Sequence, residues 1–437
     1  MLVGSADAKE LFARLLKQPR PGHFYPLPTP PRPGAPPDLF SGGGEASLYL
    51  HIPYCQTRCT YCFFVSQIGL GADDIDAYLS ELEQEVALAR DSLADYRFSS
   101  IYFGGGTPGL LSPDAFRRMV RAIRSLWPEG ATATLETHPC FANDKRIAAW
   151  REAGVDRVSL GVQTLDPELL DQINRNPQRD ETLPALERLL AAGFGDVNVD
   201  ILYGLPSQTM ETWLETVDAM VGAGVPSISV YVTTFVPDTR ARFTEIGAAF
   251  CNRQTVRDMY HAAFERLKAA GFHQDHYGCS TFSRIPYKFG LNVHRQHVLA
   301  ALPLVGLGMG AYGSVPGYTY LNQMSRAGYR AALAAGKLPV LTSCAVPATE
   351  RPHKYAVEAW KMGFLNKDVY AEKFGEELAD RFGAELGALV ELGEIVEAGR
   401  EYHLTRQGAA RQHVIADMFI SPEARAAQES RQGGRTA

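Results

Sequence analysis

Three cysteines share one short segment of this chain, and their side chains could hold a metal centre together. Cys55, Cys59 and Cys62 have the spacing Cys-x3-Cys-x2-Cys. A four-iron, four-sulfur cluster normally takes four thiolates, so three would leave one iron open to another ligand. A zinc site with His51 as the fourth ligand is the alternative, although structural zinc usually draws pairs of ligands from separated segments. The remaining cysteines lie singly, as is typical of small buried residues, at Cys140, Cys251, Cys279 and Cys344.

A second group of candidate residues lies where short apolar runs end. Glu136 ends the run TATLETHP, Gln163 ends RVSLGVQT, and Asp200 lies within DVNVDILYGLP. A polar group inside an apolar strand is costly unless it has a partner. Carboxylates and an amide that converge at one end of a sheet could hold an ammonium group, ribose hydroxyls or a sulfonium. The glycines at 104–106 would let the backbone approach such a ligand closely.

These runs are the strands that must position the candidate residues. They alternate with amphipathic stretches whose apolar residues have helical spacing. Strand and helix in this order predict a parallel sheet, and barrels of this kind keep their active sites at the carboxyl ends of the strands. We therefore expect an α/β fold, a partial (β/α)6 TIM-like barrel with a smaller C-terminal helical or winged-helix-like domain. The expected strands lie within residues 47–53, 98–107, 132–139, 157–164, 196–206 and 227–235.

Changes in composition along the chain predict five segments. Pro and Gly dominate the N-terminal arm, and the last residues are polar and rich in Ala, Arg and Gln, which predicts disorder. The expected segments are the arm at 1–46, the barrel at 47–240, a barrel extension with substrate-site loops at 241–345, the C-terminal domain at 346–420 and the disordered tail at 421–437.

Composition and charge exclude several classes of protein. The chain has 437 residues, of which 46% are hydrophobic and 21% charged, the profile of a globular protein with a large core. A net charge of -6 without long runs of one sign gives no electrostatic footprint for nucleic acid or an anionic membrane. No stretch is apolar enough to span a bilayer, and the N-terminus has no signal-peptide core. We expect a cytoplasmic protein without nucleic-acid or membrane partners.

The segment YLHIPYCQTRCTYC at 49–62 resembles the cluster loop of radical S-adenosylmethionine (SAM) enzymes, in the oxygen-independent coproporphyrinogen dehydrogenase-like branch. The motifs GGGTP, ETHP, GVQ and NVDILYGLP follow in that family's order, and the resemblance covers most of residues 47–320. It implies a [4Fe-4S] cluster on the three cysteines, with SAM chelating the open iron and yielding a 5′-deoxyadenosyl radical on reductive cleavage. The resemblance assigns to this first SAM the residues Tyr49, Gly105, Gly106, Thr107, Glu136, Gln163, Arg175 and Asp200.

The same branch often binds a second SAM beside the first. The resemblance implies that its contacts would come from Leu202, Tyr203, Gly204 and Thr234. Two SAM molecules side by side imply C1 transfer: the radical would take hydrogen from the methyl group of the second SAM, and the resulting methylene radical would add to an sp2 carbon of the substrate. The product would carry a methyl group or a cyclopropane, and proximity is most of what the protein must supply.

Four functions within this branch compete. Phe64 stands where the dehydrogenase has a further cysteine, and Phe63-Phe64 replaces the Asp-Phe that is typical of heme chaperones. We favour a class C radical SAM methyltransferase or cyclopropanase that acts on aromatic natural products. The alternatives are an anaerobic heme-opening methyltransferase, which GYTYLN at 317–322 resembles, a heme chaperone, and a coproporphyrinogen dehydrogenase-type enzyme. The expected partners are a small aromatic or peptide-derived substrate and an electron donor of the flavodoxin or ferredoxin type.

Overall fold

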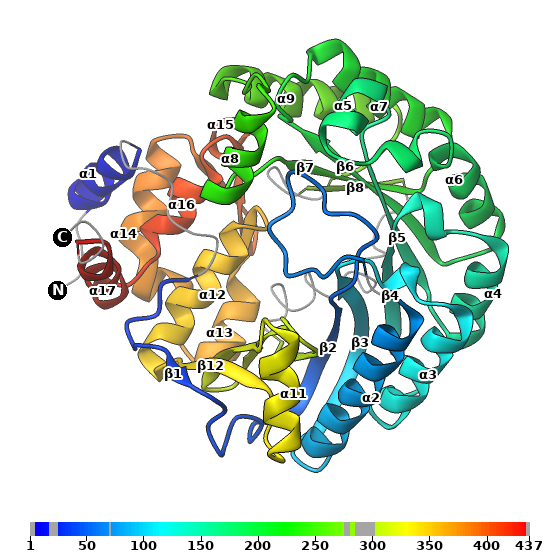
Figure 1. Cartoon of the computed structure of the whole chain (residues 1–437). Coiled ribbons are helices and arrows are strands. Elements are labelled where there is room, and N and C mark those ends of the chain that lie inside the picture. The colour runs from blue at the N-terminus through cyan, green and yellow to red at the C-terminus, as the bar shows by residue number, and fades with distance from the viewer. Residues whose placement is uncertain (1–4, 17–24, 70, 275–279, 285–301, 434–437) are drawn as a thin grey trace.

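The computed structural model describes residues 5–16, 25–69, 71–274, 280–284 and 302–433, so that Cys279 lies outside the described part. Within this part the chain has one sheet of twelve strands and one of three. Figure 1 shows the strands of the larger sheet curving around a centre, with helices outside them. The expected α/β fold, a partial barrel with a smaller C-terminal helical domain, is confirmed.

Six parallel strands form the wall of the barrel, each paired with the next in chain order. Side chains alternate between the two faces of a strand. On the first strand Leu48 and Leu50 are fully buried in the main hydrophobic core, whereas Ser47 and Tyr49 occupy the alternate positions. The strands are β2 (Gly44–Ile52), β3 (Tyr96–Gly105), β4 (Thr132–Thr137), β5 (Arg157–Gln163), β6 (Asp196–Tyr203) and β7 (Ser227–Val232).

Helices connect these strands and cover the outside of the wall (Figure 1). Their apolar faces complete the main core; Trp150 of α4 and Trp213 of α7, for example, are fully buried. The helices are α2 (Ala72–Ala89), α3 (Pro113–Ile123), α4 (Asp144–Ala153), α5 (Pro167–Gln172), α6 (Thr182–Ala191), α7 (Met210–Gly222), α8 (Pro237–Glu245) and α9 (Arg253–Ala269).

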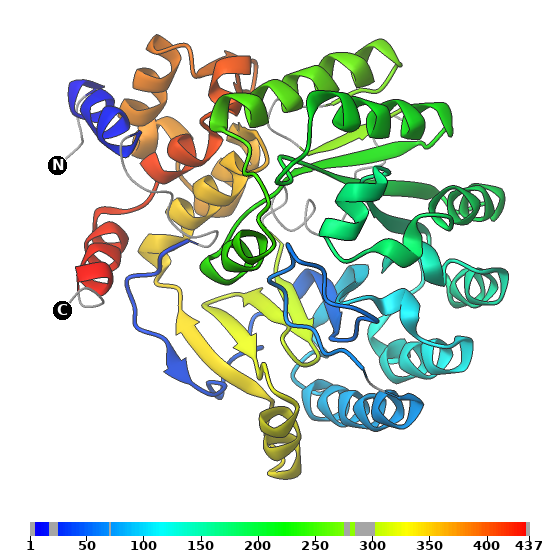
Figure 2. The ribbon, with the colours of Figure 1, turned by 45° about the horizontal axis from the view of Figure 1, so that its top comes forward.

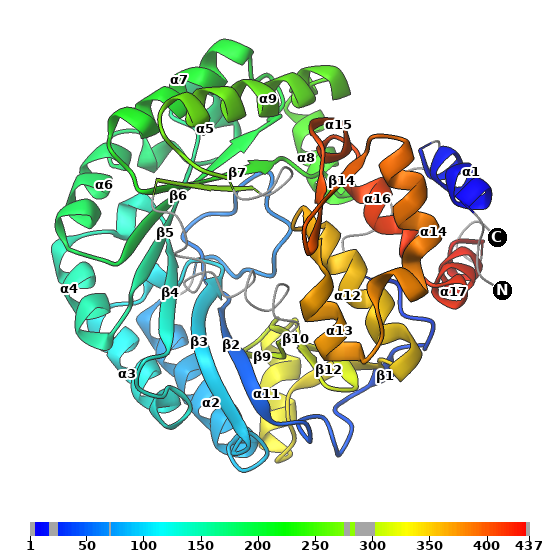
Figure 3. The same ribbon diagram turned by 180° about the vertical axis from the view of Figure 1, so that it is seen from behind.

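The wall is extended at both edges and, over the residues that the structure describes, does not close. Strand β7 pairs with β8, and on the other side β2 pairs with β9, which continues into an antiparallel run that ends at β1. The C-terminal unit lies between these two edges, as the views in Figures 2 and 3 show. The extending elements are β1 (Arg32–Pro33), β8 (Thr281–Ser283), β9 (Leu304–Leu307), β10 (Tyr312–Val315), β11 (Tyr318–Asn322), α11 (Arg326–Ala334) and β12 (Val340–Ala345).

The C-terminal unit has its own hydrophobic core, in which Trp360 and Phe382 are buried. A three-stranded antiparallel sheet packs there with helices, in keeping with the winged-helix-like expectation. Its elements are α12 (Arg351–Trp360), β13 (Phe364–Asn366), α13 (Lys367–Phe374), α14 (Leu378–Glu391), β14 (Ile395–Ala398), β15 (Glu401–Leu404), α15 (Arg406–Ala409) and α16 (Gln412–Met418).

Both ends of the described chain contain helices, and the one at the C-terminal end contradicts the prediction of disorder there. The arm contains α1 (Ser5–Leu15), which packs against α14 and α16. The tail expected to be disordered forms α17 (Pro422–Gly433) instead. Ser421 Oγ accepts a hydrogen bond from Ala424 N at 3.0 Å, and Ala424 is fully buried. A side-chain cap and good helix-forming residues, Ala and Arg among them, outweigh the polar composition there.

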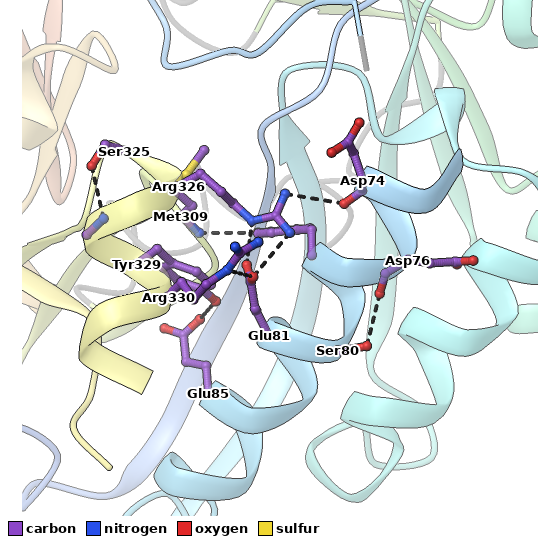
Figure 4. A network of polar contacts seen from close by, with 12 residues as sticks. Asp74, Asp76, Ser80, Glu81, Glu85, Met309, Ser325, Arg326, Tyr329 and Arg330 are labelled. Carbon is purple, nitrogen blue, oxygen red and sulfur yellow. Dashed lines mark hydrogen bonds and ion pairs between the residues drawn. The ribbon is translucent and has the colours of Figure 1, made fainter. Parts of the chain in front are cut away.

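Buried acidic residues of α2 hold the barrel to its extension (Figure 4). Glu81 forms an ion pair with Arg326 of α11. Glu85 is 1% exposed, and burial raises the pKa of its carboxyl to about 7. Its hydrogen-bond donors are Gly308 N, Asn322 Nδ2 and Tyr329 Oη.

No helix in the described part of the chain is long and apolar enough to cross a membrane.

Candidate metal centre and barrel interior

The three cysteines lie on the segment that follows β2, residues 53–68, here called the cysteine loop. In Figures 1 and 2 this blue segment crosses the centre of the ring of strands. Thr107 N, just after β3, donates a hydrogen bond to Tyr54 O at 2.7 Å, and Thr60 N donates to Ile173 O, after α5, at 3.2 Å. Neighbouring parts of the barrel therefore fix the course of the loop.

The first two cysteines each have a hydrogen-bond donor at their sulfur. Thr107 Oγ1 lies 3.5 Å from Cys55 Sγ, and Arg175 Nε lies 3.3 Å from Cys59 Sγ. Donors of this kind stabilise a thiolate and tune a metal bound to it. The resemblance assigned both donor residues, Thr107 and Arg175, to SAM. In this structure their donor atoms face the cysteine sulfurs.

The three cysteines of the loop are free thiols. None forms a disulfide. Burial raises the pKa of Cys55, and it raises the pKa of Cys62 to about 11. A metal centre must displace these protons when it binds, so its affinity falls at low pH. Three thiols on one hydrogen-bonded loop, two of them with donors at sulfur, are a donor set that fits a [4Fe-4S] cluster.

The zinc alternative needs His51 as a ligand, and His51 is already engaged. Its Nδ1 lies 3.0 Å from Tyr49 Oη and its Nε2 lies 3.1 Å from Val65 O. Among the described residues, no three His, Cys, Asp or Glu side chains are arranged to hold a single metal ion. The geometry around His51 therefore argues against zinc.

The glycine segment after β3 packs against the cysteine loop. Gly105 has φ +111°, and a Cβ there would lie 2.8 Å from the His51 ring. A Cβ on Gly106 would lie 2.5 Å from Tyr54 O. Gly105 thus packs against the His51 ring of β2 and Gly106 against the backbone of the cysteine loop, and a contact of these glycines with a ligand stays a prediction. Glycine is required at Gly105 for a second reason, because φ in this range strains other residues.

Carboxyl groups from β4 and β6 lie inside the ring of strands. Tyr102 Oη, from β3, donates to Glu136 Oε1 at 2.6 Å. Ser159 Oγ donates to Asp200 Oδ2 at 2.9 Å. Burial raises the pKa of Glu136 to about 7 and raises that of Asp200 as well. Both carboxyls keep some accessible surface, so a ligand inside the barrel could reach them.

Gln163 and Arg175 lie together at the end of β5. Arg175 Nη1 donates to Gly161 O at 2.6 Å and to Gln178 Oε1 at 3.0 Å. Gln163 has φ 68°, which is uncommon for a residue with a side chain and is found where surrounding structure enforces it. This backbone conformation at the strand end supports Gln163 as a ligand-binding residue more strongly than its position in the sequence does.

The residues expected at a second SAM are divided between two sides of β6. The ring of Tyr203 lies 5.8 Å from Trp213 and 6.0 Å from Tyr260, among the covering helices and away from the barrel interior. A Cβ on Gly204 would lie 3.1 Å from Val256. Leu202 belongs to the buried apolar cluster against which Tyr61 of the cysteine loop packs.

Sequence reasoning missed several residues of the site. Tyr61 lies in the cysteine loop and packs against the apolar cluster around Phe243. Tyr231 is 41% exposed on β7, where it faces Asp200. Tyr102 and Tyr231 share the inward register of polar residues on their strands, so the period of two could have revealed them. Arg242, which donates to the Cys62 carbonyl at 3.2 Å, carries no signal in the sequence.

Comparison with known proteins places this site in a family. A family model described as the radical SAM superfamily matches residues 49–220. The chain is 28% identical over 382 residues to the heme chaperone HemW of Bacillus subtilis, covering 86% of this chain and 99% of that protein. It is 31% identical over 308 residues to the oxygen-independent coproporphyrinogen III oxidase of Bradyrhizobium diazoefficiens, covering 68% of each.

A solved structure shows the same fold. Coproporphyrinogen III oxidase (HemN) from Escherichia coli, a radical SAM enzyme, superposes with a TM-score of 0.75 at 22% identity, over 87% of this chain and 90% of that chain. The radical SAM family implies a [4Fe-4S] cluster and SAM, and the cysteine loop fits the cluster. By its sequence relatives and its three-cysteine loop, this chain belongs to the radical SAM superfamily and, within it, to the family of coproporphyrinogen III oxidases and heme chaperones.

Proposed function

We propose that this chain is a radical SAM enzyme that binds a tetrapyrrole and directs radical chemistry to it. The observation that carries the proposal is the match to a heme chaperone over 99% of that protein's length. The coproporphyrinogen III oxidase relative is also named for a tetrapyrrole. This proposal covers the three alternatives from the sequence analysis that involve a tetrapyrrole: the heme-opening methyltransferase, the heme chaperone and the coproporphyrinogen dehydrogenase-type enzyme.

The residues of the site have separate tasks in this proposal. A reduced [4Fe-4S] cluster, when bound, supplies the electron that cleaves SAM to methionine and a 5′-deoxyadenosyl radical. Cys55, Cys59 and Cys62 hold the cluster, and an electron donor of the flavodoxin or ferredoxin type would reduce it. Glu136 and Asp200 present carboxyl groups inside the barrel, suited to the ammonium and ribose groups of SAM.

The barrel interior also supports binding of an organic ligand. Tyr231 keeps 41% of its surface accessible although it faces Asp200 from within the ring of strands. Phe63 and Phe64 on the cysteine loop stack with ring centroids 4.9 Å apart, and 57% of Phe64 is exposed. Exposed aromatic rings beside the cluster loop could stack on a planar substrate. Tyr231 and Phe64 are the surfaces we expect a tetrapyrrole to meet.

The experiment is an anaerobic titration. The chain is reconstituted with iron and sulfide, heme or coproporphyrin III is added, and the Soret band is followed. In parallel, 5′-deoxyadenosine formed from SAM under dithionite is measured with and without the tetrapyrrole. Saturable binding together with faster formation of 5′-deoxyadenosine is expected. SAM cleavage with no saturable binding of either compound would overturn the proposal.

Two variants control this titration. Cys59→Ala should abolish 5′-deoxyadenosine formation and lower the iron content far below the about four atoms of a full cluster. Cys251→Ala is the matched control, because its thiol lies against the Leu205 and Gln208 carbonyls and takes no part in the loop. Cleavage of SAM by Cys59→Ala at the unmodified rate would remove the cluster from the proposal.

C1 transfer to an sp2 carbon of an aromatic natural product, with methyl or cyclopropane as product, is the second candidate. The observation that favours it is Phe64, which occupies the position of the further cysteine expected of the dehydrogenase. SAM with a deuterated methyl group separates the candidates. Deuterium in 5′-deoxyadenosine, formed with S-adenosylhomocysteine, would identify a second SAM as the target of the radical. Unlabelled 5′-deoxyadenosine without S-adenosylhomocysteine would exclude C1 transfer.

A further inference from the structure

The third cysteine is held by an element that the sequence motifs do not include. Arg242 lies on α8, and its Nη1 donates a hydrogen bond to the carbonyl of Cys62 at 3.2 Å. The first two cysteines have Thr107 and Arg175 at their sulfurs. Each cysteine is therefore contacted from a different part of the barrel, and Arg242 supplies the contact to the third.

Helix α8 is rigidly placed for this contact. Phe243, the next residue, is fully buried and packs in an apolar cluster with Ile173 and Leu205, which Tyr61 of the cysteine loop joins. The ring of Phe235 meets that of Phe243 at 5.6 Å. Helix α8 and the cysteine loop thus pack against the same apolar cluster, which fixes the position of Arg242 relative to Cys62.

The charge of Arg242 is only partly neutralised. Its guanidinium pairs with Asp238 one turn earlier on α8, and Asp238 is 66% exposed, so water screens that carboxylate. The Arg242 side chain itself is 23% exposed. A guanidinium cannot lose its proton under ordinary conditions, so a positive charge lies permanently beside the third cysteine.

We propose that Arg242 is a positioning residue that holds the Cys62 end of the cysteine loop and raises the reduction potential of the cluster bound there. Reduction adds one negative charge to a cluster that three thiolates already make negative, so a nearby cation favours the reduced form. Charge and hydrogen bonding around the sulfurs are established determinants of cluster potential. The inference rests on the cluster, which the family implies, and not on the identity of the substrate.

The test is a potentiometric titration of the reconstituted chain, followed by the EPR signal of the reduced cluster. Arg242→Gln removes the charge and should shift the midpoint potential to more negative values. Arg242→Lys keeps the charge and should shift it less. Asp238→Asn removes the neutralising carboxylate and should move the potential in the opposite direction, while leaving the guanidinium in place.

Arg240→Gln is the matched control on the same helix. Its guanidinium stacks on Phe250 at 4.6 Å and on Phe235 at 5.4 Å. The control should keep the wild-type potential even if it melts at a lower temperature. If Arg242→Gln binds less iron but its intact clusters keep the wild-type potential, the residue is structural only and the proposal fails.

If Arg242→Gln does not assemble a cluster, the midpoint potential of Asp238→Asn tests the effect of the Arg242 charge. An unchanged potential in Asp238→Asn would then overturn the electrostatic part of the proposal. These outcomes are independent of the tetrapyrrole proposal, because the potential is measured without substrate. If neither tetrapyrrole binds in the Soret titration but the midpoint potentials shift as expected, the role of Arg242 stands and the tetrapyrrole proposal is refuted.

Discussion

Individual polar residues inside the barrel are held in protonation states that differ from those in water. Glu136 shows this most clearly, because burial raises the pKa of its carboxyl to about 7. Tyr49, Tyr102, Asp200 and Arg157 are the titratable groups around it. In the ligand-free protein Glu136 is protonated below this pKa and ionised above it. A cationic ligand would favour the ionised form and lower the pKa.

We therefore predict that SAM binds more tightly as the pH rises through about 7. Binding would be linked to release of the Glu136 proton, and a coupling of one pKa unit corresponds to roughly tenfold in affinity. Isothermal titration calorimetry of the reconstituted protein, one pH unit to either side of the Glu136 pKa of about 7, measures the affinity for SAM. Glu136→Gln should bind more weakly and lose that part of the pH dependence, whereas exposed Glu129→Gln should keep it. An identical slope in Glu136→Gln would contradict the assignment.

At the scale of elements, the site depends on contact between the end of β3 and the end of β2, from which the cysteine loop departs. A Cβ on Gly105 would meet the His51 ring at 2.8 Å, and φ is +111° there. Gly105→Ala should lower the free energy of unfolding by about 1–3 kcal/mol, measured by urea denaturation, and reduce iron content. Gly222→Ala in α7 has open space around its Cβ and should change stability by less than about 1 kcal/mol. Equal stability of the two variants would refute the packing argument.

The elements were largely predictable, because strand periodicity is local. The run predicted at 157–164 corresponds to β5, Arg157–Gln163, and the spacing of the cysteines indicated their metal chemistry. The contacts between elements were not predictable. Arg242 meets Cys62 only because an apolar cluster brings α8 beside the loop. The composition of the tail also led to a wrong prediction of disorder, because the Ser421 cap and the burial of Ala424 stabilise a helix there.

At the scale of the whole molecule, the strands in the described part of the chain do not close the barrel, since β1 and β8 end the order of the sheet. The C-terminal unit lies in the gap (Figure 3). The N-terminal arm and the start of α17 both reach this unit at one carboxylate. Tyr25 Oη donates to Glu350 Oε2 at 2.6 Å, and Ser421 Oγ donates to the same oxygen at 2.8 Å. Glu350 is 3% exposed, so its carboxyl oxygens need these donors as hydrogen-bond partners in place of water.

Tyr25→Phe should therefore destabilise the C-terminal unit and, through it, the open side of the barrel. Leaving a buried acceptor short of one donor costs about 1–3 kcal/mol, and more when the acceptor is charged. Thermal unfolding and limited proteolysis measure the effect, with cleavage expected first between residues 346 and 433. Tyr318→Phe is the control, since the loss of its exposed hydrogen bond to Asp38 should leave the melting temperature close to that of the unmodified protein. If both variants melt alike, or if cleavage of Tyr25→Phe begins in the parallel wall instead, the two chain segments do not stabilise the C-terminal unit through Glu350.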